Sequence, residues 1–274
     1  MKLILANSRL YILISSLLIF SACNKRLANT GQTGIKKSEK GKTYDIYALM
    51  GQSNMAGRGE IDSLSNTYKS KNVLVLTASG ELKIAEHPLH FDKSIAAVGP
   101  GLMFGHELSK FTENKIILVP CAVGGSSIKL WQPGMFDGAT NTHPYDDAIS
   151  RLEKVLESGG EIKGVIWHQG ESDRAKYTKE RYLSELTILI NRLRKFTGNP
   201  NLPFVVGELG YFIDGADKFN EWIKDLSNLV DYTAVVSAEG LQHKGDNLHF
   251  DARSAERLGV RYAEAMKSIE PKIE

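Results

Sequence analysis

Six short runs, most of them almost uninterrupted in apolar residues, alternate along this chain with segments whose apolar residues recur every three to four positions. A strand is apolar at nearly every position only when both faces of its sheet are covered, so these runs predict parallel strands. The pattern predicts an α/β fold in which helices cover both faces of a parallel sheet. The predicted strands are residues 44–50, 73–77, 115–122, 164–170, 204–210 and 233–238.

The intervening segments have the spacing of amphipathic helices. Apolar stripes run through residues 148–156, 182–193 and 255–266, and two shorter helices are expected over residues 102–112 and 217–229. The chain has 274 residues, of which 42% are hydrophobic and 24% charged, which is enough for one sizeable core. With no internal repeat and no Pro- or Ser-rich break, the segment from residue 43 to 274 is expected to be a single domain.

The first 23 residues have the layout of a secretory signal. Lys2 and Arg9 precede the apolar run "YILISSLLIF", which is followed by the small residues of "SAC". The run is too short for a stable membrane span. Residues 1–23 are therefore expected to be a signal peptide rather than part of the core.

The cysteine that ends this signal carries a further expectation. The sequence "FSAC" resembles a bacterial lipobox, so Cys23 is expected to be lipidated and to anchor the protein in the bacterial cell envelope. Asn24 next to it favours the outer membrane by the same resemblance. The alternative is an ordinary signal with a chance cysteine. Cys121, in "IILVPCAVGG", is expected to be a small buried residue, and lipidation of Cys23 would leave it without a disulfide partner.

Charge is distributed unevenly between the leader and the domain. Residues 24–42 are polar and basic without apolar periodicity, which predicts a flexible tether. Residues 1–42 hold 8 Lys/Arg and 1 Asp/Glu of the chain's 34 and 32, which leaves 26 and 31, a net charge of −5, in residues 43–274. The domain has no basic excess of the kind that binds nucleic acid, so nucleic acid is not an expected partner.

Polar residues follow four of the predicted strands. Carboxyl ends of parallel strands meet at one edge of a sheet, where ligand sites of such folds lie. We therefore expect a site at this edge, built from "GQSN" (51–54), "VGGSS" (123–127), "HQGESD" (168–173) and "GDNLHF" (245–250).

Ser53 is the candidate nucleophile, because it directly follows a predicted strand; the alternative is a serine that caps a helix. A serine needs a base, and His249 is the best placed of the seven histidines. Asp246, three residues earlier, can orient the imidazole. Helix capping beside a surface histidine is the alternative for this D-x-x-H pattern.

Two other strand ends offer hydrogen-bond donors for a developing oxyanion. Gln169 can donate a side-chain N–H, and the glycine turn at 123–127 can offer backbone N–H groups. The alternatives are an ordinary polar turn at the first and a plain turn at the second.

Five motifs, in order, resemble those of the SGNH-type carbohydrate acetylesterases, in the branch that contains acetylxylan esterases and sialic-acid 9-O-acetylesterases. The resemblance covers essentially all of residues 43–274 and implies a three-layer, flavodoxin-like SGNH-hydrolase fold. The motifs are "GQSNMAGRG" (51–59), "VGPGLMFGHEL" (98–108), "AVGGSSIKLW" (122–131), "WHQGESD" (167–173) and "DNLHFDARSAERLG" (246–259).

The resemblance implies a role for each matching residue. Ser53 would be the nucleophile and, through its own N–H, one oxyanion donor; Gly125, or Gly124 in its place, would be the second, and Gln169 the third. His249 would be the base. The chain has "GQS" where the broad pattern has "GDS", and "HQGE" where it has a glycine–asparagine block, which leaves two candidate acids. Asp246 is expected to be the principal partner of His249, with Glu171 as a second contributor.

The implied reaction removes O-acetyl groups from carbohydrate through an acetyl-enzyme and needs no metal or cofactor. Its expected partners are an acetylated carbohydrate and, through the lipid anchor, a membrane. The single compact domain favours plant cell-wall acetyl groups over sialic acid by family analogy. Gln52, Asn54, Arg58 and Trp131 are candidate substrate contacts; for Arg58 the favoured alternative is a surface ion pair, and for Trp131 an equal alternative is a core position.

Two other functions compete with this one. His168, Glu171, Asp246 and His249 are residue types that bind zinc, although H-x-x-E with D-x-x-H fits no recognised zinc spacing and leaves Ser53 unexplained. A non-catalytic glycan-binding lipoprotein on the same scaffold is the other alternative, because fold does not guarantee chemistry.

Overall fold

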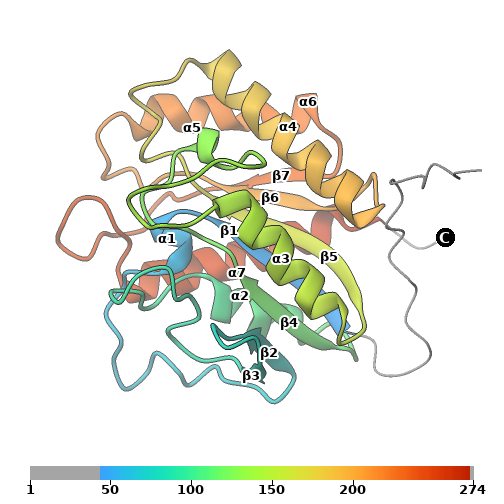
Figure 1. Cartoon of the computed structure of the whole chain (residues 1–274). Coiled ribbons are helices and arrows are strands. Elements are labelled where there is room, and N and C mark those ends of the chain that lie inside the picture. Colours follow the sequence, from blue (N-terminus) through green and yellow to red (C-terminus); the bar gives the residue numbers. More distant parts are fainter. Residues whose placement is uncertain (1–43, 272–274) are drawn as a thin grey trace, which may run out of the picture. The chain divides into compact units, whose positions relative to one another are not determined.

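The computed structural model describes residues 44–271, which form a seven-stranded sheet covered by helices (Figure 1). The predicted signal peptide, Cys23 and the tether over residues 24–42 lie outside the described residues. The sheet order is β3-β2-β4-β1-β5-β6-β7, and β3 alone is antiparallel to its neighbour. The strands are β1 (Tyr44–Gly51), β2 (Val73–Leu76), β3 (Leu82–Ile84), β4 (Lys115–Pro120), β5 (Glu161–His168), β6 (Phe204–Gly207) and β7 (Thr233–Val236).

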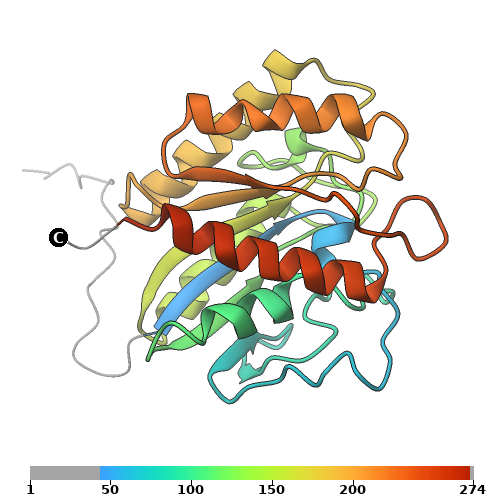
Figure 2. The same ribbon diagram turned by 180° about the vertical axis from the view of Figure 1, so that it is seen from behind.

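Helices lie on both faces of the sheet, which confirms the predicted three-layer α/β architecture. In Figure 1, α3 and α4 cross the near face, and the reverse view in Figure 2 shows α2 and α7 on the other. The helices are α1 (Ser53–Ala56), α2 (Gly101–Leu108), the 3₁₀ helix η1 (Ile128–Leu130), α3 (Pro144–Leu156), α4 (Lys179–Thr197), α5 (Ala216–Lys224), α6 (Leu226–Leu229) and α7 (Ala252–Ile269). Among residues 44–271, no helix combines the length and apolarity that a membrane crossing requires.

Strand β1 shows why the apolar runs are uninterrupted. Ile46, Ala48 and Met50 belong to the core cluster beneath α3 and α4, whereas Tyr47 and Leu49 belong to the cluster beneath α2 and α7. Successive side chains of a strand point to opposite faces, and here both faces are buried. Each position of the run is therefore apolar because it has a core to fill.

Three short elements and one helix differ from the sequence-based expectation. Strand β3, helix α1 and the 3₁₀ helix η1 were not predicted, because three or four residues are too few to show a periodicity. The helix expected over residues 217–229 is two helices, α5 and α6, separated at Asp225.

The strand order places the end of β1 in the middle of the sheet. The chain leaves β1 for β2, β3 and β4 on one side and then crosses to β5, β6 and β7 on the other. Counted among the parallel strands alone, the order is 2-3-1-4-5-6, so β4 lies between β1 and β2, which are neighbours in the flavodoxin order. The loops after β4 and β5 thus diverge on either side of β1, at the position where open α/β sheets bind ligands.

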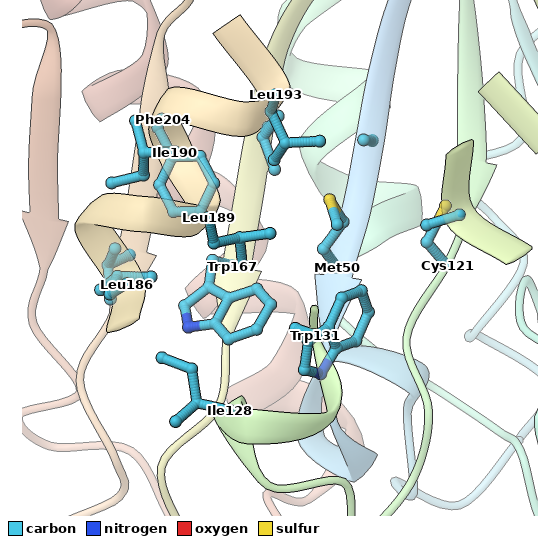
Figure 3. Close-up of a cluster of buried hydrophobic side chains, with 14 of the residues drawn as sticks. Met50, Cys121, Ile128, Trp131, Trp167, Leu186, Leu189, Ile190, Leu193 and Phe204 are labelled. Atoms are coloured by element: carbon cyan, nitrogen blue, oxygen red, sulfur yellow. The ribbon is translucent and has the colours of Figure 1, made fainter. Parts of the chain in front are cut away.

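Trp131 and Cys121 both belong to the core beneath α3 and α4 (Figure 3). Trp131 is 1% exposed and its ring meets that of Trp167 edge to face, with centroids 5.0 Å apart. Cys121 is buried, and burial raises the pKa of its thiol to about 12. The expectation of a small buried cysteine is confirmed.

Candidate active site

Ser53 lies at the carboxyl end of β1, where the chain turns sharply into α1. The turn depends on Gly51, whose φ is +127° and whose hydrogen faces β5 so closely that a Cβ would stand 2.1 Å from the His168 carbonyl oxygen. Gln52, not Ser53, is the residue that precedes the helix, and the Ser53 hydroxyl lies 3.1 Å from Nε2 of His249. The capping alternative for Ser53 is therefore wrong.

His249 lies between Ser53 and Asp246. Its Nδ1 is 2.7 Å from Oδ2 of Asp246, while Oδ1 of Asp246 accepts the backbone N–H groups of Leu248 and His249 at 3.0 and 2.8 Å. A carboxylate only accepts, so Nδ1 carries the imidazole proton and Nε2 is free to accept a proton from Ser53. The three side chains form a continuous hydrogen-bonded chain.

Hydrogen bonds on its exposed loop favour the ionised form of the Asp246 carboxylate. Partial burial acts to raise its pKa, but the hydrogen bonds from His249 and Leu248 outweigh burial and hold the pKa of Asp246 well below its ordinary value. Lys244 adds a positive charge, with Nζ 3.4 Å from Oδ2. Asp246 can therefore keep His249 in one tautomer and balance the charge of an imidazolium.

Glu171, expected as a second acid on the imidazole, is directed elsewhere. Its Oε1 accepts from Nδ2 of Asn54 at 2.6 Å and lies 3.7 Å from Nε2 of His168, and no hydrogen bond of the described residues joins it to His249. Burial raises the pKa of Glu171 to about 7, against the hydrogen bond from Asn54, which lowers it. The position on Nδ1 of His249 is already taken by Asp246, which corrects the expectation of a shared acid.

Two backbone N–H groups are available to stabilise an oxyanion. Within residues 44–271, neither the N–H of Ser53 nor that of Gly125 donates to a protein acceptor, whereas the N–H of Gly124 donates to Oδ2 of Asp92 at 2.9 Å. This decides between the two glycines in favour of Gly125. Gly125 has a φ of +88°, and a Cβ there would meet nothing within 4 Å, so its surroundings are open.

Gln169 does not offer the third donor that the sequence predicted. Its Nε2 donates to the carbonyl oxygen of Ser126 at 3.1 Å and to Oδ2 of Asp173 at 2.7 Å, while its Oε1 accepts from the hydroxyl of Tyr182 at 2.9 Å. The side chain is fully buried. Both amide hydrogens are used to hold the turn that contains Gly125, so Gln169 supports the oxyanion donors and is not one of them.

Comparison with known proteins shows the family of the chain. The sequence profile of the family described as carbohydrate esterase, sialic acid-specific acetylesterase, matches residues 43–268. The chain is 35% identical over 246 residues to a probable carbohydrate esterase of Arabidopsis thaliana, At4g34215, with 81% of this chain and 90% of that protein covered. The chain belongs to this carbohydrate esterase family.

Solved structures confirm the fold of the esterase. The crystal structure of the Arabidopsis thaliana protein superposes with a TM-score of 0.73 and 32% identity, covering 83% of this chain and 99% of that chain. NanS superposes with a TM-score of 0.63 and 16% identity, covering 83% of this chain and 97% of that chain. XAC1771, a carbohydrate acetylesterase from Xanthomonas citri, superposes with a TM-score of 0.60 and 19% identity, covering 82% of this chain and 56% of that chain. The resemblance to SGNH-type carbohydrate acetylesterases is thereby confirmed.

All four candidate substrate contacts of the esterase are buried parts of its framework. Trp131 is a core residue that donates from Nε1 to the hydroxyl of Ser126 at 3.1 Å, so its ring has no face for a sugar. Gln52 is buried and accepts the N–H groups of Gly170 and Ser172 at 3.5 and 3.4 Å. Asn54 is buried as well and is bonded to Glu171. These contacts correct the expected substrate roles.

Arg58 forms an ion pair, as the favoured alternative had it, but the pair is buried. Its Nη2 lies 2.8 Å from Oδ2 of Asp92, and the two side chains are only 4% and 2% exposed. The same Oδ2 holds the N–H of Gly124. The ion pair of the esterase therefore supports the turn whose next residue, Gly125, presents the free N–H.

We expect Arg58→Met to lower the free energy of unfolding by about 3–5 kcal/mol, because it leaves the Asp92 carboxylate buried without its cation. Lys154→Met is the matched control, since its partner Glu157 and Lys154 itself are more than half exposed, and we expect a loss within about 1 kcal/mol. Urea unfolding measures both. Equal losses in the two variants would contradict a structural role for the buried pair.

The four residues considered for a zinc site fall into two separate pairs. Asp246 contacts His249, and Glu171 lies beside His168. No three His, Cys, Asp or Glu side chains among residues 44–271 are grouped as metal ligands would be. Burial lowers the pKa of His168 to about 3, and its Nδ1 is bonded to the hydroxyl of Tyr262 at 3.1 Å.

Sequence reasoning missed two supporting carboxylates. Asp173 accepts from the hydroxyl of Ser127 and the N–H of Ile128 at 2.6 and 2.7 Å, in addition to Gln169. Asp173 is the last residue of "WHQGESD", so its position just after a buried strand could have indicated a role in the site. Asp92 lies in an irregular segment with no periodicity and gave no signal.

A cavity of about 760 Å³ lies at the other end of the sheet from Ser53. Its lining includes Asp45, Glu161 and Pro203, which stand at or just before the amino ends of β1, β5 and β6. The hydrogen-bonded chain from Ser53 to Asp246 is at the carboxyl ends of the strands, so this cavity is separate from the candidate active site.

Proposed function

We propose that this esterase removes O-acetyl groups from carbohydrate by a serine mechanism with an acetyl-enzyme intermediate. The observation that carries the proposal is the hydrogen-bonded chain from Ser53 through His249 to Asp246, with contacts of 3.1 and 2.7 Å. It occurs in a member of a carbohydrate esterase family, at the strand ends where such folds carry their chemistry.

In the first half-reaction, Ser53 Oγ attacks the acetyl carbonyl carbon while its proton passes to Nε2 of His249. The carbonyl oxygen becomes an oxyanion, which the N–H groups of Ser53 and Gly125 stabilise. The bond from the acetyl carbon to the sugar oxygen then breaks, and the imidazolium gives its proton to that oxygen. The products are a free sugar hydroxyl and an acetylated Ser53.

In the second half-reaction, His249 takes a proton from water, and the water oxygen attacks the acetyl carbon of the intermediate. The same two N–H groups stabilise the second oxyanion. Its collapse releases acetate, and the proton on His249 returns to Oγ of Ser53. Asp246 balances the imidazolium charge in both halves.

The proposal is tested by measuring acetate release from acetylated xylan, pectin, mannan and 9-O-acetyl sialic acid, with 4-nitrophenyl acetate as a simple ester. Release from at least one glycan, retained after exhaustive chelation, is the expected result. Hydrolysis of the simple ester without release from any glycan would contradict the carbohydrate substrate. No hydrolysis of any ester would favour the glycan-binding alternative.

We also propose that the esterase is anchored to the bacterial cell envelope through lipidated Cys23, on the strength of "FSAC" after a short apolar run. We expect Cys23→Ser to move the protein from the membrane fraction to the soluble fraction, because the acyl chains would be lost. Cys121→Ala, which removes the other cysteine, should remain with the membrane. A Cys23→Ser variant that stays as firmly bound as the wild type would contradict lipid anchoring.

A further inference from the structure

Asn54 joins the element that carries the nucleophile to the loop that carries the base. It follows Ser53 directly in α1. Its Nδ2 donates to the carbonyl oxygen of Leu248 at 3.1 Å, and its Oδ1 accepts from the N–H of Phe250 at 3.1 Å. The two peptide groups it holds therefore belong to the residues on either side of His249.

The loop needs such an anchor because much of it faces solvent. Residues 244–248, including Asp246, are exposed, and Asn247 has a φ of +53°. Its internal backbone bonds are few: Lys244 N–H donates to the carbonyl oxygen of His249 at 2.9 Å, and His243 bridges to Phe250. Asn54 is the side chain that ties this loop to the same short helix as Ser53.

Glu171 in turn fixes Asn54. Its Oε1 accepts from Nδ2 of Asn54 at 2.6 Å, which selects the amide orientation that points Nδ2 at Leu248 and Oδ1 at Phe250. Glu171 is 5% exposed, and within the described part of the chain its Oε2 has no hydrogen-bond partner. Burying a carboxyl group costs free energy unless it is hydrogen-bonded, and the side chain that donates to Glu171 is Asn54. The role that follows for Glu171 is to accept this hydrogen bond.

His168, the neighbour of Glu171, is neutral and supplies no positive charge to pair with a carboxylate. The Tyr262 hydroxyl donates to the carbonyl oxygen of Trp167 at 2.9 Å, so the 3.1 Å contact with His168 requires Nδ1 of His168 to be the donor. Nε2 of His168 is then an unprotonated acceptor, without a partner among residues 44–271, and faces Glu171 at 3.7 Å. A neutral carboxyl or amide group at position 171 keeps an oxygen that can accept from Nδ2 of Asn54, so this hydrogen bond does not depend on a negative charge.

We propose that Asn54 and Glu171 are positioning residues that hold the peptide groups on both sides of His249 and so set the distance from Nε2 of His249 to the Ser53 hydroxyl. This rests on the proposed serine mechanism. Glu171 acts on His249 through Asn54, by accepting a hydrogen bond, and its charge is not required.

The first test compares Asn54→Ala with Asn220→Ala. Asn220 is a matched control, because it is fully buried and holds a backbone in the same way, with Oδ1 accepting from Leu209 N–H at 2.8 Å and Nδ2 donating to its carbonyl oxygen at 3.0 Å. With 4-nitrophenyl acetate, Asn54→Ala is expected to lower kcat about 10²-fold with KM little changed, as for a catalytic group displaced by about 1 Å. Asn220→Ala should keep kcat within about threefold, even if it unfolds at a lower temperature. Equal losses of kcat in the two variants, or a near-wild-type kcat in Asn54→Ala, would overturn the proposal.

The second test separates hydrogen bonding from charge at position 171. Glu171→Gln keeps the acceptor for Asn54, and its kcat should stay within about tenfold of the wild type. Glu171→Ala leaves one N–H of Asn54 without its acceptor, and its kcat should fall about as much as that of Asn54→Ala. A loss of about 10⁴-fold in Glu171→Gln would mean that the charge itself is needed, as for an acid partner. A Glu171→Ala variant with wild-type kcat would remove Glu171 from the proposal.

A third measurement does not depend on turnover. The Nδ1 proton of His249, donated to Asp246 over 2.7 Å, is expected to give a low-field proton resonance that is absent from His249→Gln. Loss or an upfield shift of this resonance in Asn54→Ala, with retention in Asn220→Ala, is the expected result, and an unchanged resonance in both would overturn the proposal. If the wild type hydrolyses no ester, the proposed function fails, while this comparison still decides whether Asn54 positions His249.

Discussion

Ser53→Ala is expected to reduce kcat for ester hydrolysis about 10⁶-fold while the fold survives. The hydroxyl is the only group of Ser53 that the substitution removes, and its hydrogen bond of 3.1 Å goes to His249. No acetyl-enzyme can form without it. Its backbone N–H remains, so oxyanion stabilisation and substrate binding should leave a small residual rate.

Ser65→Ala is the control for this substitution, since Ser65 is also buried but bonds to Asp62. We expect its kcat to stay within about threefold of the wild type. Initial rates with 4-nitrophenyl acetate, together with thermal unfolding of both variants, make the comparison. A folded Ser53→Ala preparation that keeps a tenth of the wild-type activity would show that Ser53 is not the nucleophile.

Asp246→Asn is expected to lower kcat about 10⁴-fold. The carboxylate accepts from Nδ1 of His249, which keeps Nε2 as the base; an amide nitrogen facing Nδ1 would instead favour the opposite tautomer. The substitution also removes the charge that stabilises the imidazolium. Stability should fall less than activity, because Asp246 lies on an exposed loop and its Oδ1 contacts can be kept by the amide oxygen.

Glu171→Gln provides the comparison at the other candidate acid, and we expect its kcat to fall at most about tenfold. Steady-state kinetics of both variants and the double variant distinguish the assignments. A large loss in Glu171→Gln with little loss in Asp246→Asn would reverse the roles of the two acids. Comparable losses, with a double variant no worse than either, would show that the acids act as one unit on His249.

The layers of the fold could be predicted because they depend on local patterns of hydrophobicity. Residues such as Ile46 and Tyr47 alternate between the two faces of β1, and both faces are buried, so the run is apolar throughout. Strand β3 was not predicted because its three residues are too few to establish an alternating pattern. The position of Ser53 at a strand end was visible for the same reason as the strand itself.

The candidate triad of Ser53, His249 and Asp246 was also within reach of sequence reasoning. Asp246 and His249 are three residues apart on one turn, so their contact is local and depends little on the rest of the fold. Glycine at position 51 marked the turn before Ser53. These features are set by short stretches of chain, and the resemblance of five such stretches to one family joined them into a single predicted site.

The hydrogen bonds that hold the candidate site in place depend on the tertiary structure. Asn54 is 196 residues from Phe250 and 117 from Glu171, and Gln169 is 43 residues from Ser126. The amide side chains of Asn54 and Gln169 can both donate and accept hydrogen bonds. Their residue type therefore does not say whether they contact a substrate or a distant loop.

The sequence by itself therefore determined the layered α/β fold, the strand-end serine and its local His–Asp partner. The tertiary structure decided that Gly125 rather than Gly124 has a free N–H, that Gln169 holds a turn, and that Glu171 faces Asn54. The physical reason is that burial and hydrogen-bond partners of these groups depend on which loops are brought together at the ends of β1, β4 and β5, and no short stretch of the chain contains that information.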